Sequence, residues 1–478
     1  MIDISSRLPV RADLIIGPEY DNRTETVETE QSPKKLEFMG DFPELEVIHP
    51  ALDFAKGTLF TAVPSMGLPE GPTINWIVTS RRELFPLERM EMFNRKLHPR
   101  VCCDKLSISP RYGGAVVKAF SEGALEGDLL GTYVRVKQCL EACIDLLDDE
   151  TYAFLTTWII GTYMFPAFNA FPYIHFNGPR ATGKTTSLEV LWKLCFNGQL
   201  TPSVTPAAQF RLIEACRPTL LIDEAENLGR RAQNETRAIF LHGYAKGGEV
   251  FRVERVGRTW TLAPFEVFCP RAFASQQGFE DTLDSRTVRI PMTRTRRQRP
   301  KLDREDVQSI REDCFLASLT CAPVIYDIYS SLDDPEGVLP FFGRDYELFQ
   351  PSMAIALATG DAGIVGDLTN FAIKSYRRKE AELYESSPEH AFLDFLLEHV
   401  VKDGEYPGSV LLRAFKQFTL DNGIKLNRDW TLQLQGTMLA NLGLVDKTDK
   451  RRAERNHARV YFLSRKKLEE VADNYNLM

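Results

Sequence analysis

Residues 173–186, with the sequence YIHFNGPRATGKTT, constrain the fold of this chain more than any other stretch. They contain the pattern G-x-x-x-x-G-K-[ST], in which a glycine-rich loop turns successive backbone N–H groups toward phosphate oxygens. Lys184 adds a positive charge at the β and γ phosphates, and the Thr185 hydroxyl can bind Mg²⁺. The sequence therefore predicts a binding site for a nucleoside triphosphate, formed by Gly178, Pro179, Arg180, Ala181, Thr182, Gly183, Lys184, Thr185 and Thr186.

The residues on both sides of this loop have the pattern of a strand and a helix. The run 173–176 ahead of it is apolar, and Leu188, Leu191, Trp192 and Cys195 behind it follow helical spacing. A phosphate-binding loop is expected between these two kinds of element. The context therefore favours a genuine site over a chance match.

A pair of acidic residues follows a second apolar run. Residues 220–222 read as a strand buried on both faces of a parallel sheet, and they end in Asp223 and Glu224, 39 residues after Lys184. Asp223 can hold a Mg²⁺-bound water, and Glu224 can accept a proton from the water that attacks the γ-phosphate. The alternative is that both acids only cap the next helix. Their position at the carboxyl end of a strand favours catalysis.

The remaining segments predict three more strands and one insertion. A short strand is expected near 200–205, a helix over 207–216 and another over 230–242. The segment EVFCPRAFA reads as the fourth strand and ends in Ser275 and Gln276, while TVRIPM reads as the fifth and directly follows Arg286. The count from the phosphate-binding loop is therefore five strands.

The insertion before the fourth strand reads as a β-hairpin. Its strands are expected over 249–255 and 258–264, with Arg255 and Arg258 at the tip. Such a tip, with Lys246 beside it, could bind nucleic-acid phosphates, or it could be an ordinary solvated turn.

Length and composition predict about three domains of an ordinary globular protein. The chain has 478 residues, of which 44% are hydrophobic and 26% charged. A net charge of -8 argues against a protein that coats nucleic acid with its whole surface. The uncharged run 154–171 is broken by polar residues and by Pro166, so a buried helix is favoured over a membrane span. We expect no contact with a membrane.

The cysteine pattern bears on metal binding and on compartment. Nine cysteines occur without a C-x-x-C pair and without a histidine at zinc-ligand spacing. Cys139 and Cys143 lie one helical turn apart and read as core packing. Together with the phosphate-binding loop and the lack of a signal-peptide pattern, this predicts a cytoplasmic protein.

The two ends of the chain read as separate units. Residues 1–121 predict a small α+β module in which we find no catalytic group, and 122–170 predict a helical collar. After a core over 171–295 and a helical lid over 296–385, residues 386–478 predict three helices and then a basic turn between two strands. This order is that of a winged helix, with phosphate contacts expected from Arg451, Arg452, Arg455 and Arg459. The basic run could equally be a solvated face, and the domain a protein dock.

With these motifs in place, residues 171–360 resemble the AAA+ ATPases, and among them the replication helicases of phages, plasmids and mobile elements. These are relatives of the minichromosome maintenance and superfamily-three viral helicases. GPRATGKTT is similar to the family's GPPGTGKT, from which it departs at Arg180 and Ala181, and LLIDEAE matches the family's acidic motif. The hairpin resembles the family's insertion that grips DNA in a central pore. The implied fold is an α/β P-loop NTPase core with a parallel sheet, a hairpin insertion and a helical lid.

The resemblance also implies roles for three polar positions. Ser275 or Gln276 stands where the family keeps a polar sensor, although the usual residue there is Asn or Thr. Arg286 looks like the arginine finger that reaches the γ-phosphate of a neighbouring subunit. Arg344, in GRDYELFQPSMAIA, looks like the second sensor at the start of the lid. The plain alternative for either arginine is a salt bridge at a surface or between domains.

Taken together, the resemblance implies an ATP- and Mg²⁺-dependent DNA helicase or translocase of a mobile element. It is expected to work as a ring, most simply a hexamer, around single-stranded DNA, with a separate primase or replication partner. An ATP-controlled DNA-binding switch, such as an initiator, a helicase loader or a defence-system ATPase, is the alternative. An inactive nucleotide-binding scaffold is a further alternative, which the intact Lys184, Asp223 and Glu224 disfavour.

Overall fold

A computed structural model of the chain describes thirteen segments of the sequence. They are residues 48–49, 51–64, 75–86, 112–201, 205–225, 234–256, 259–295, 299–300, 302–332, 339–386, 388–424, 429–445 and 459–474. All of them fall within one of the two units of the chain, Glu46–Met478.

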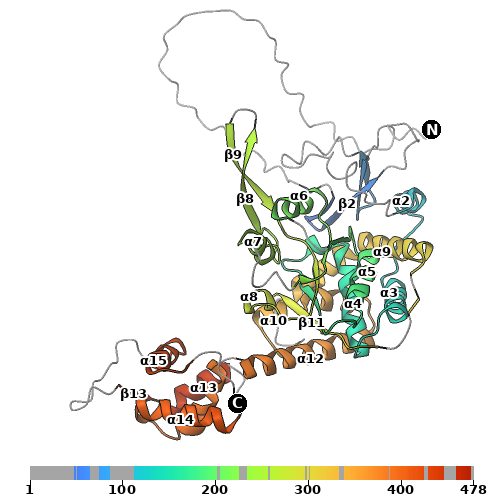
Figure 1. Cartoon of the computed structure of the whole chain (residues 1–478). Helices are drawn as coiled ribbons and strands as arrows, with labels where there is room; N and C mark the ends of the chain where they lie inside the picture. The colour runs from blue at the N-terminus through green and yellow to red at the C-terminus, as the bar shows by residue number, and fades with distance from the viewer. Residues whose placement is uncertain are drawn as a thin grey trace, which may run out of the picture. The chain divides into compact units, whose positions relative to one another are not determined.

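A five-stranded parallel sheet lies at the centre of the core (Figure 1). Its order is β11-β5-β10-β7-β6, which places the first strand along the chain between the fifth and the fourth. The strands are β5 (Tyr173–Asn177), β6 (Gln199–Thr201), β7 (Leu220–Ile222), β10 (Arg271–Ser275) and β11 (Thr287–Pro291). The predicted parallel sheet is confirmed, and the mixed α/β arrangement is consistent with a P-loop NTPase-like core.

Helices between these strands cover the sheet. They are α5 (Lys184–Leu194), α6 (Pro206–Cys216), α7 (Asn234–His242) and α8 (Asp281–Asp284). Thr205 caps α6 by accepting a hydrogen bond from the Ala208 N–H at 3.3 Å. Leu188 and Leu191 of α5 and Cys195 at its C-cap are buried, as their helical spacing predicts, whereas Trp192, expected on the same face, is 43% exposed.

Further helices enclose the core before and after the sheet. They are α2 (Gly114–Ser121), α3 (Leu129–Cys143), α4 (Asp149–Thr162), the 3₁₀ turn η3 (Phe165–Ala167), α9 (Arg304–Ser331), α10 (Gly343–Glu347), α11 (Gln350–Ala358) and α12 (Ala362–Ser386). Helix α4 is buried from Thr151 to Thr162, because it packs against α3, α11 and α12. Within the described part of the chain, no helix has the length and apolar character needed to cross a membrane.

The hairpin and an amino-terminal sheet are the other β structures near the core. The predicted hairpin is present as β8 (Glu249–Val256) and β9 (Thr259–Glu266), which pair in antiparallel fashion. The amino-terminal sheet is an antiparallel meander of β1 (Leu52–Ala55), β2 (Thr58–Pro64), β3 (Asn75–Thr79) and β4 (Leu84–Pro86).

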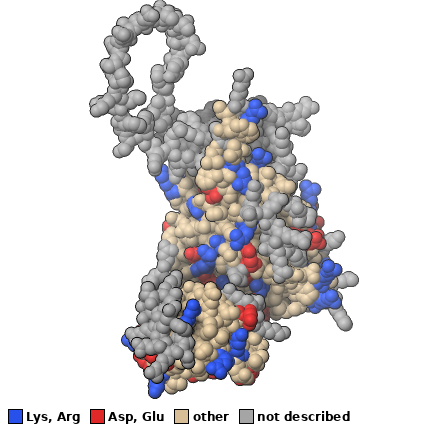
Figure 2. Space-filling model, turned by 60° about the vertical axis from the view of Figure 1, so that its left-hand side comes forward, with Lys and Arg blue, Asp and Glu red and all other residues tan. Residues whose placement is uncertain are grey.

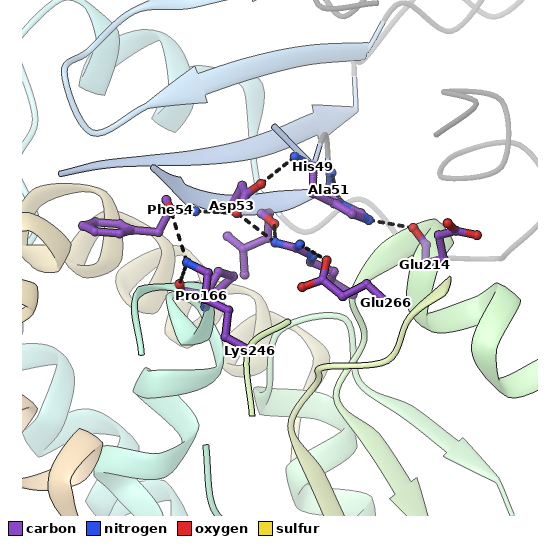
Figure 3. Close-up of polar contacts among 10 residues, drawn as sticks. His49, Ala51, Asp53, Phe54, Pro166, Glu214, Lys246 and Glu266 are labelled. Carbon is purple, nitrogen blue, oxygen red and sulfur yellow. Dashed lines mark hydrogen bonds and ion pairs between the residues drawn. The ribbon is translucent and has the colours of Figure 1, made fainter. Parts of the chain in front are cut away.

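A buried ion pair ties β1 to the core (Figure 3). The Arg217 guanidinium, at the end of α6, donates to Asp53 Oδ1 at 3.0 Å and to the Leu52 carbonyl at 2.8 Å. The same guanidinium contacts Glu266 at the end of β9. One buried side chain therefore joins the amino-terminal sheet, α6 and the root of the hairpin.

A second set of contacts at the same place involves His49. Its Nδ1 accepts from the Ala51 N–H at 3.1 Å, so Nε2 carries the proton and donates to the Glu214 carbonyl at 2.6 Å. Burial, with the positive charge of Arg217, lowers the pKa of His49 to about 3. The imidazole is therefore neutral at physiological pH.

The carboxy-terminal segment has its own small core of aromatic and aliphatic side chains. It contains α13 (Pro388–His399), β12 (Gly404–Pro407), α14 (Gly408–Asp421), α15 (Leu432–Asn441), β13 (Val460–Leu463) and α16 (Arg465–Asn474). The three predicted helices are present. Strand β13 pairs with β12, an unpredicted strand between the first two helices, and the strand expected before the basic turn falls on residues after Val445 that lie outside the described part of the chain. Helix α12 continues through Ser386, just before this domain begins.

Candidate functional site

The phosphate-binding loop joins β5 to α5, as predicted. Gly183 has φ 87° and stands at the N-cap of α5, where it leaves the first N–H groups of the helix uncapped by a side chain. Ala181 is also left-handed, with φ 61°, at a position where glycine would carry less strain. A Cβ at Gly178 would lie 2.3 Å from the Met292 carbonyl oxygen, so only glycine fits there.

Lys184 points back over this loop. Its ammonium donates to the carbonyl oxygens of Gly178 and Pro179, each at 2.7 Å. The two carbonyls hold the positive charge above the loop, where phosphates would meet it.

The two residues predicted as metal ligands lie together. The Thr185 hydroxyl donates to Asp223 Oδ2 at 2.8 Å, although 38 residues separate them in the sequence. A hydroxyl and a carboxylate are the hard oxygen donors that Mg²⁺ prefers, and Mg²⁺ completes its shell with waters and substrate phosphates. Among the described residues no cluster of three or more His, Cys, Asp or Glu could hold a metal ion.

Glu224 follows directly and has a strained backbone. Its φ is 52°, and its N–H donates to Asp223 Oδ1 at 2.9 Å. A non-glycine residue with this φ costs about 1–3 kcal/mol, and such outliers gather at functional positions. The exposed Glu224 side chain is thus held next to the candidate metal ligands.

Ser275 lies at the end of β10, as expected of a sensor, but its side chain is buried. Its hydroxyl donates to the Gln277 carbonyl at 2.6 Å and accepts from His175 Nε2 at 2.6 Å. Burial, with the charges of Arg289 and Lys184, lowers the pKa of His175 to about 3, so this histidine is neutral. The Ser275 hydroxyl therefore has two partners inside the protein, whereas Gln276 is exposed at the same strand end.

The phosphate-binding loop lies at the carboxyl ends of the strands, here called the carboxyl edge of the sheet. Arg286 lies at their amino ends, the amino edge. The Tyr173 N–H donates to the Arg286 carbonyl at 3.0 Å, so Arg286 lies at the amino end of β5, whereas the loop follows its carboxyl end. A strand of five residues spans roughly 17 Å. Arg286 therefore cannot reach a phosphate bound in its own loop.

Arg344 lies beside Arg286 rather than beside the loop. Arg344 Nη1 donates to Ser285 Oγ at 3.3 Å, and Arg286 Nε donates to the Leu241 carbonyl at 3.2 Å. Burial and the neighbouring charge of Arg344 lower the pKa of Arg286, although a guanidinium stays protonated at neutral pH. The two arginines form one positive pair at the amino edge of the sheet.

The predicted nucleic-acid contacts are not gathered in one place. Arg255 is exposed on β8 near the hairpin tip, whereas Lys246 lies at the root and donates to the Pro166 carbonyl at 2.8 Å (Figure 3). Arg459 is exposed at the start of β13, and its carbonyl accepts from the Gly408 N–H at 2.7 Å. Arg258, Arg451, Arg452 and Arg455 lie outside the described residues.

A cavity beside the phosphate-binding loop was not predicted from the sequence. It has a volume of about 590 Å³ and is bordered by Thr182, Gly183 and Thr186 on one side and by Ile144, Met292 and Leu302 on another. A cavity of this volume beside the loop has room for the base and sugar of a nucleotide, and the charged residues Asp145, Glu189 and Arg299 also line it. No sequence motif marks the apolar residues, because Ile144 precedes the loop in the sequence, whereas Met292 and Leu302 lie far beyond it.

Comparisons with known proteins give only remote likenesses, all to solved structures. No family model matches the chain, and no curated protein matches it. The A-form apo structure of the C-terminal region of NrS-1 is 12% identical, with a TM-score of 0.32, over 71% of this chain and 76% of that one. The active helicase Cch of SCCmec type IV is 12% identical, with a TM-score of 0.34, over 77% of this chain and 72% of that one. Both TM-scores are below 0.5, so these likenesses carry no argument about function.

Proposed function

We propose that this chain is an ATP-driven DNA helicase or translocase that works as a ring in the replication of a mobile element. The observation that carries the proposal is the division of the phosphate-binding groups between two edges of one sheet. Lys184, Thr185 and Asp223 lie at the carboxyl edge, and Arg286 lies at the amino edge. Such a site is complete only when the arginine of one copy meets the loop of the next, which is the geometry of a ring or a filament.

Each residue at the carboxyl edge has a defined role in this proposal. Lys184 exchanges its two carbonyl partners for the β and γ phosphates. Thr185 and Asp223 hold Mg²⁺, which neutralises phosphate charge when bound. Glu224, held beside them, accepts the proton of the attacking water.

The groups at the amino edge act on the neighbouring site. Arg286 stabilises the charge that develops on the γ-phosphate during transfer, an effect typically worth about 10³–10⁵ in rate. Arg344 lies close enough to add a second charge to the same site. In this proposal the polar sensor at the end of β10 is Gln276, or else Ser275, which would act through its contact with His175.

Movement of DNA is assigned to the hairpin and the carboxy-terminal domain. Arg255 near the hairpin tip would contact single-stranded DNA in the pore, with Arg258 and Lys246 nearby in sequence. A winged helix over residues 386–478 would add contacts through Arg459 and its basic neighbours. The proposed ring is a hexamer, and priming would come from a separate protein.

Two assays test the proposal. ATP hydrolysis should depend on Mg²⁺ and rise with single-stranded DNA, and a forked duplex should be unwound. Glu224→Gln should keep ATP binding and lose hydrolysis by about 10²–10⁴-fold, whereas the exposed and distant Glu398→Gln should behave as wild type. ATP-dependent DNA binding without unwinding would identify the chain as a switch instead. Full hydrolysis by Glu224→Gln would reject the assigned base.

A further inference from the structure

The two faces of the β8–β9 hairpin carry different side chains. Phe251 lies opposite Pro264, Val253 opposite Leu262, and Arg255 opposite Trp260. Residues directly opposite each other in an antiparallel pair share a face. We call Phe251, Val253, Trp260, Leu262 and Pro264 the apolar hairpin face, which has Arg255 at its outer end.

The other face is fixed to the core at the hairpin root. Val250 and Phe265 are both buried, and the Phe265 ring lies 4.5 Å from that of Phe210 on α6. The Arg252 guanidinium lies 5.1 Å from the same Phe210 ring. Because this side rests on α6, the apolar hairpin face is turned away from the core, and the hairpin extends beyond α6 and α7 (Figure 1).

The apolar hairpin face is open to solvent in the single chain. The exposed fractions are 55% for Phe251, 63% for Val253, 70% for Trp260 and 65% for Leu262. Together these side chains offer on the order of 500 Å² of apolar surface. A contiguous patch of this size on one element marks an interaction site more often than an accident of the surface.

The composition of this face favours a protein partner over nucleic acid. Single-stranded nucleic acid is bound by basic grooves in which aromatic side chains stack on bases. Here aliphatic residues fill the middle of the face, and the acidic Glu249 lies at its root opposite Glu266, whose carboxylate is paired with Arg217. In a view that brings this side of the molecule forward, uncharged surface predominates and basic side chains are scattered (Figure 2).

We infer that the apolar hairpin face contacts a second copy of this chain. The inference rests on the proposed function, in which Arg286 already requires a neighbouring copy. The two features are connected through α7, because the Leu241 carbonyl of α7 accepts from Arg286 and α7 also packs against β8. Arg286 and the hairpin therefore adjoin the same helix, so a copy that meets Arg286 would lie near the hairpin.

The size of the face sets the conditions for this contact. A stable interface needs about 800 Å² from each partner, which is more than the hairpin offers. The contact should thus form only when a bound triphosphate also holds Arg286 of the neighbour. Assembly should consequently require both ATP and the apolar hairpin face.

Substitutions of opposite charge at one position test the inference. Val253→Lys and Val253→Glu should both lose the assembled species seen by light scattering with a non-hydrolysable ATP analogue. Both variants should still bind the analogue and melt as the wild type does, because Val253 is exposed. Val401→Lys and Val401→Glu are matched controls, since Val401 is 77% exposed in the carboxy-terminal domain, and they should assemble normally.

Two results would overturn the inference and leave the proposed function in place. One is normal assembly of both Val253 variants. The other is normal assembly with DNA binding tightened by lysine and weakened by glutamate, which would place nucleic acid on this face. If the wild-type chain binds no ATP analogue at all, the proposed function itself fails.

Discussion

The Thr185 hydroxyl lies 2.8 Å from Asp223 Oδ2, so the loop at the start of α5 and the acid after β7 meet at one point. Asp223→Asn keeps the size of the side chain and removes its charge, so Mg²⁺ should bind more weakly. Hydrolysis should fall by more than about 100-fold at ordinary Mg²⁺ concentrations. A titration of activity against Mg²⁺ checks this, and an unchanged Mg²⁺ requirement would show that Asp223 does not hold the metal.

Gly178 provides a test of the loop's geometry. A Cβ there would lie 2.3 Å from the Met292 carbonyl oxygen, so Gly178→Ala must displace backbone at the loop. Displacement by about 1 Å can cost roughly 100-fold in rate, and we expect a loss of that order in ATP hydrolysis. Gly366→Ala is the control, because a Cβ there meets nothing within 4 Å and the residue lies inside α12. Equal activity of both variants would contradict the tight packing at Gly178.

The buried ion pair of Arg217 with Asp53 should affect the stability of the fold rather than the rate of ATP hydrolysis. Arg217→Met leaves the buried Asp53 carboxylate without its ion pair, and breaking such a pair typically costs about 3–5 kcal/mol. The double variant Asp53→Asn/Arg217→Met should be less destabilised than the single one, because the buried Asp53 charge is removed as well and only the partly exposed Glu266 loses its partner. Arg81→Met, at an exposed position of the same sheet, is the control. Denaturant unfolding measures all of them, and additive losses in the double variant would argue against the coupling.

Two buried histidines should make the fold sensitive to acid. Burial is the main cause that lowers the pKa of both His49 and His175 to about 3, whereas an unfolded histidine titrates near 6.5. The unfolded chain therefore binds more protons below about pH 6.5, and the free energy of unfolding falls by about 1.4 kcal/mol per pH unit for each histidine. His175→Gln should show a smaller drop in melting temperature between about pH 7 and about pH 5. His242→Gln, an exposed control, should keep the full drop.

The residues that the sequence could reveal are those tied to a motif or to strand periodicity. The loop up to Thr185, the acids after Leu220–Ile222 and the hairpin follow from local patterns, and the structure places them as expected. The hydrogen-bond partner of Ser275 could not be predicted from a local pattern, because His175 is an isolated polar residue inside an apolar strand. The pairing of β13 with β12 was missed because it depends on contacts across some 55 residues.

Contacts made by long side chains were the hardest to foresee. Lys246 is close in sequence to the hairpin, which suggested a role at the tip, but its ammonium binds the Pro166 carbonyl at the root. Arg344 was expected near the nucleotide as a sensor, whereas the structure places it beside Ser285 at the other edge of the sheet. In both cases tertiary packing, which no local pattern encodes, decides where the charge lies.

The most direct test of the shared site mixes two variants that are inactive for different reasons. Glu224→Gln lacks the base of its own site, and Arg286→Ala lacks the arginine for its neighbour's site. In mixed assemblies, a site is intact when its loop comes from an Arg286→Ala copy and its arginine comes from a Glu224→Gln copy. At random mixing, about one site in four is of this kind. Arg304→Ala, an exposed arginine, controls for loss of charge.

The measurement is the ATP hydrolysis rate of the equimolar mixture, with light scattering to show that the copies assemble together. The account predicts that each variant alone is nearly inactive and that the mixture recovers up to about a quarter of the wild-type rate. A mixture that assembles but stays as inactive as its components would contradict a site shared between copies.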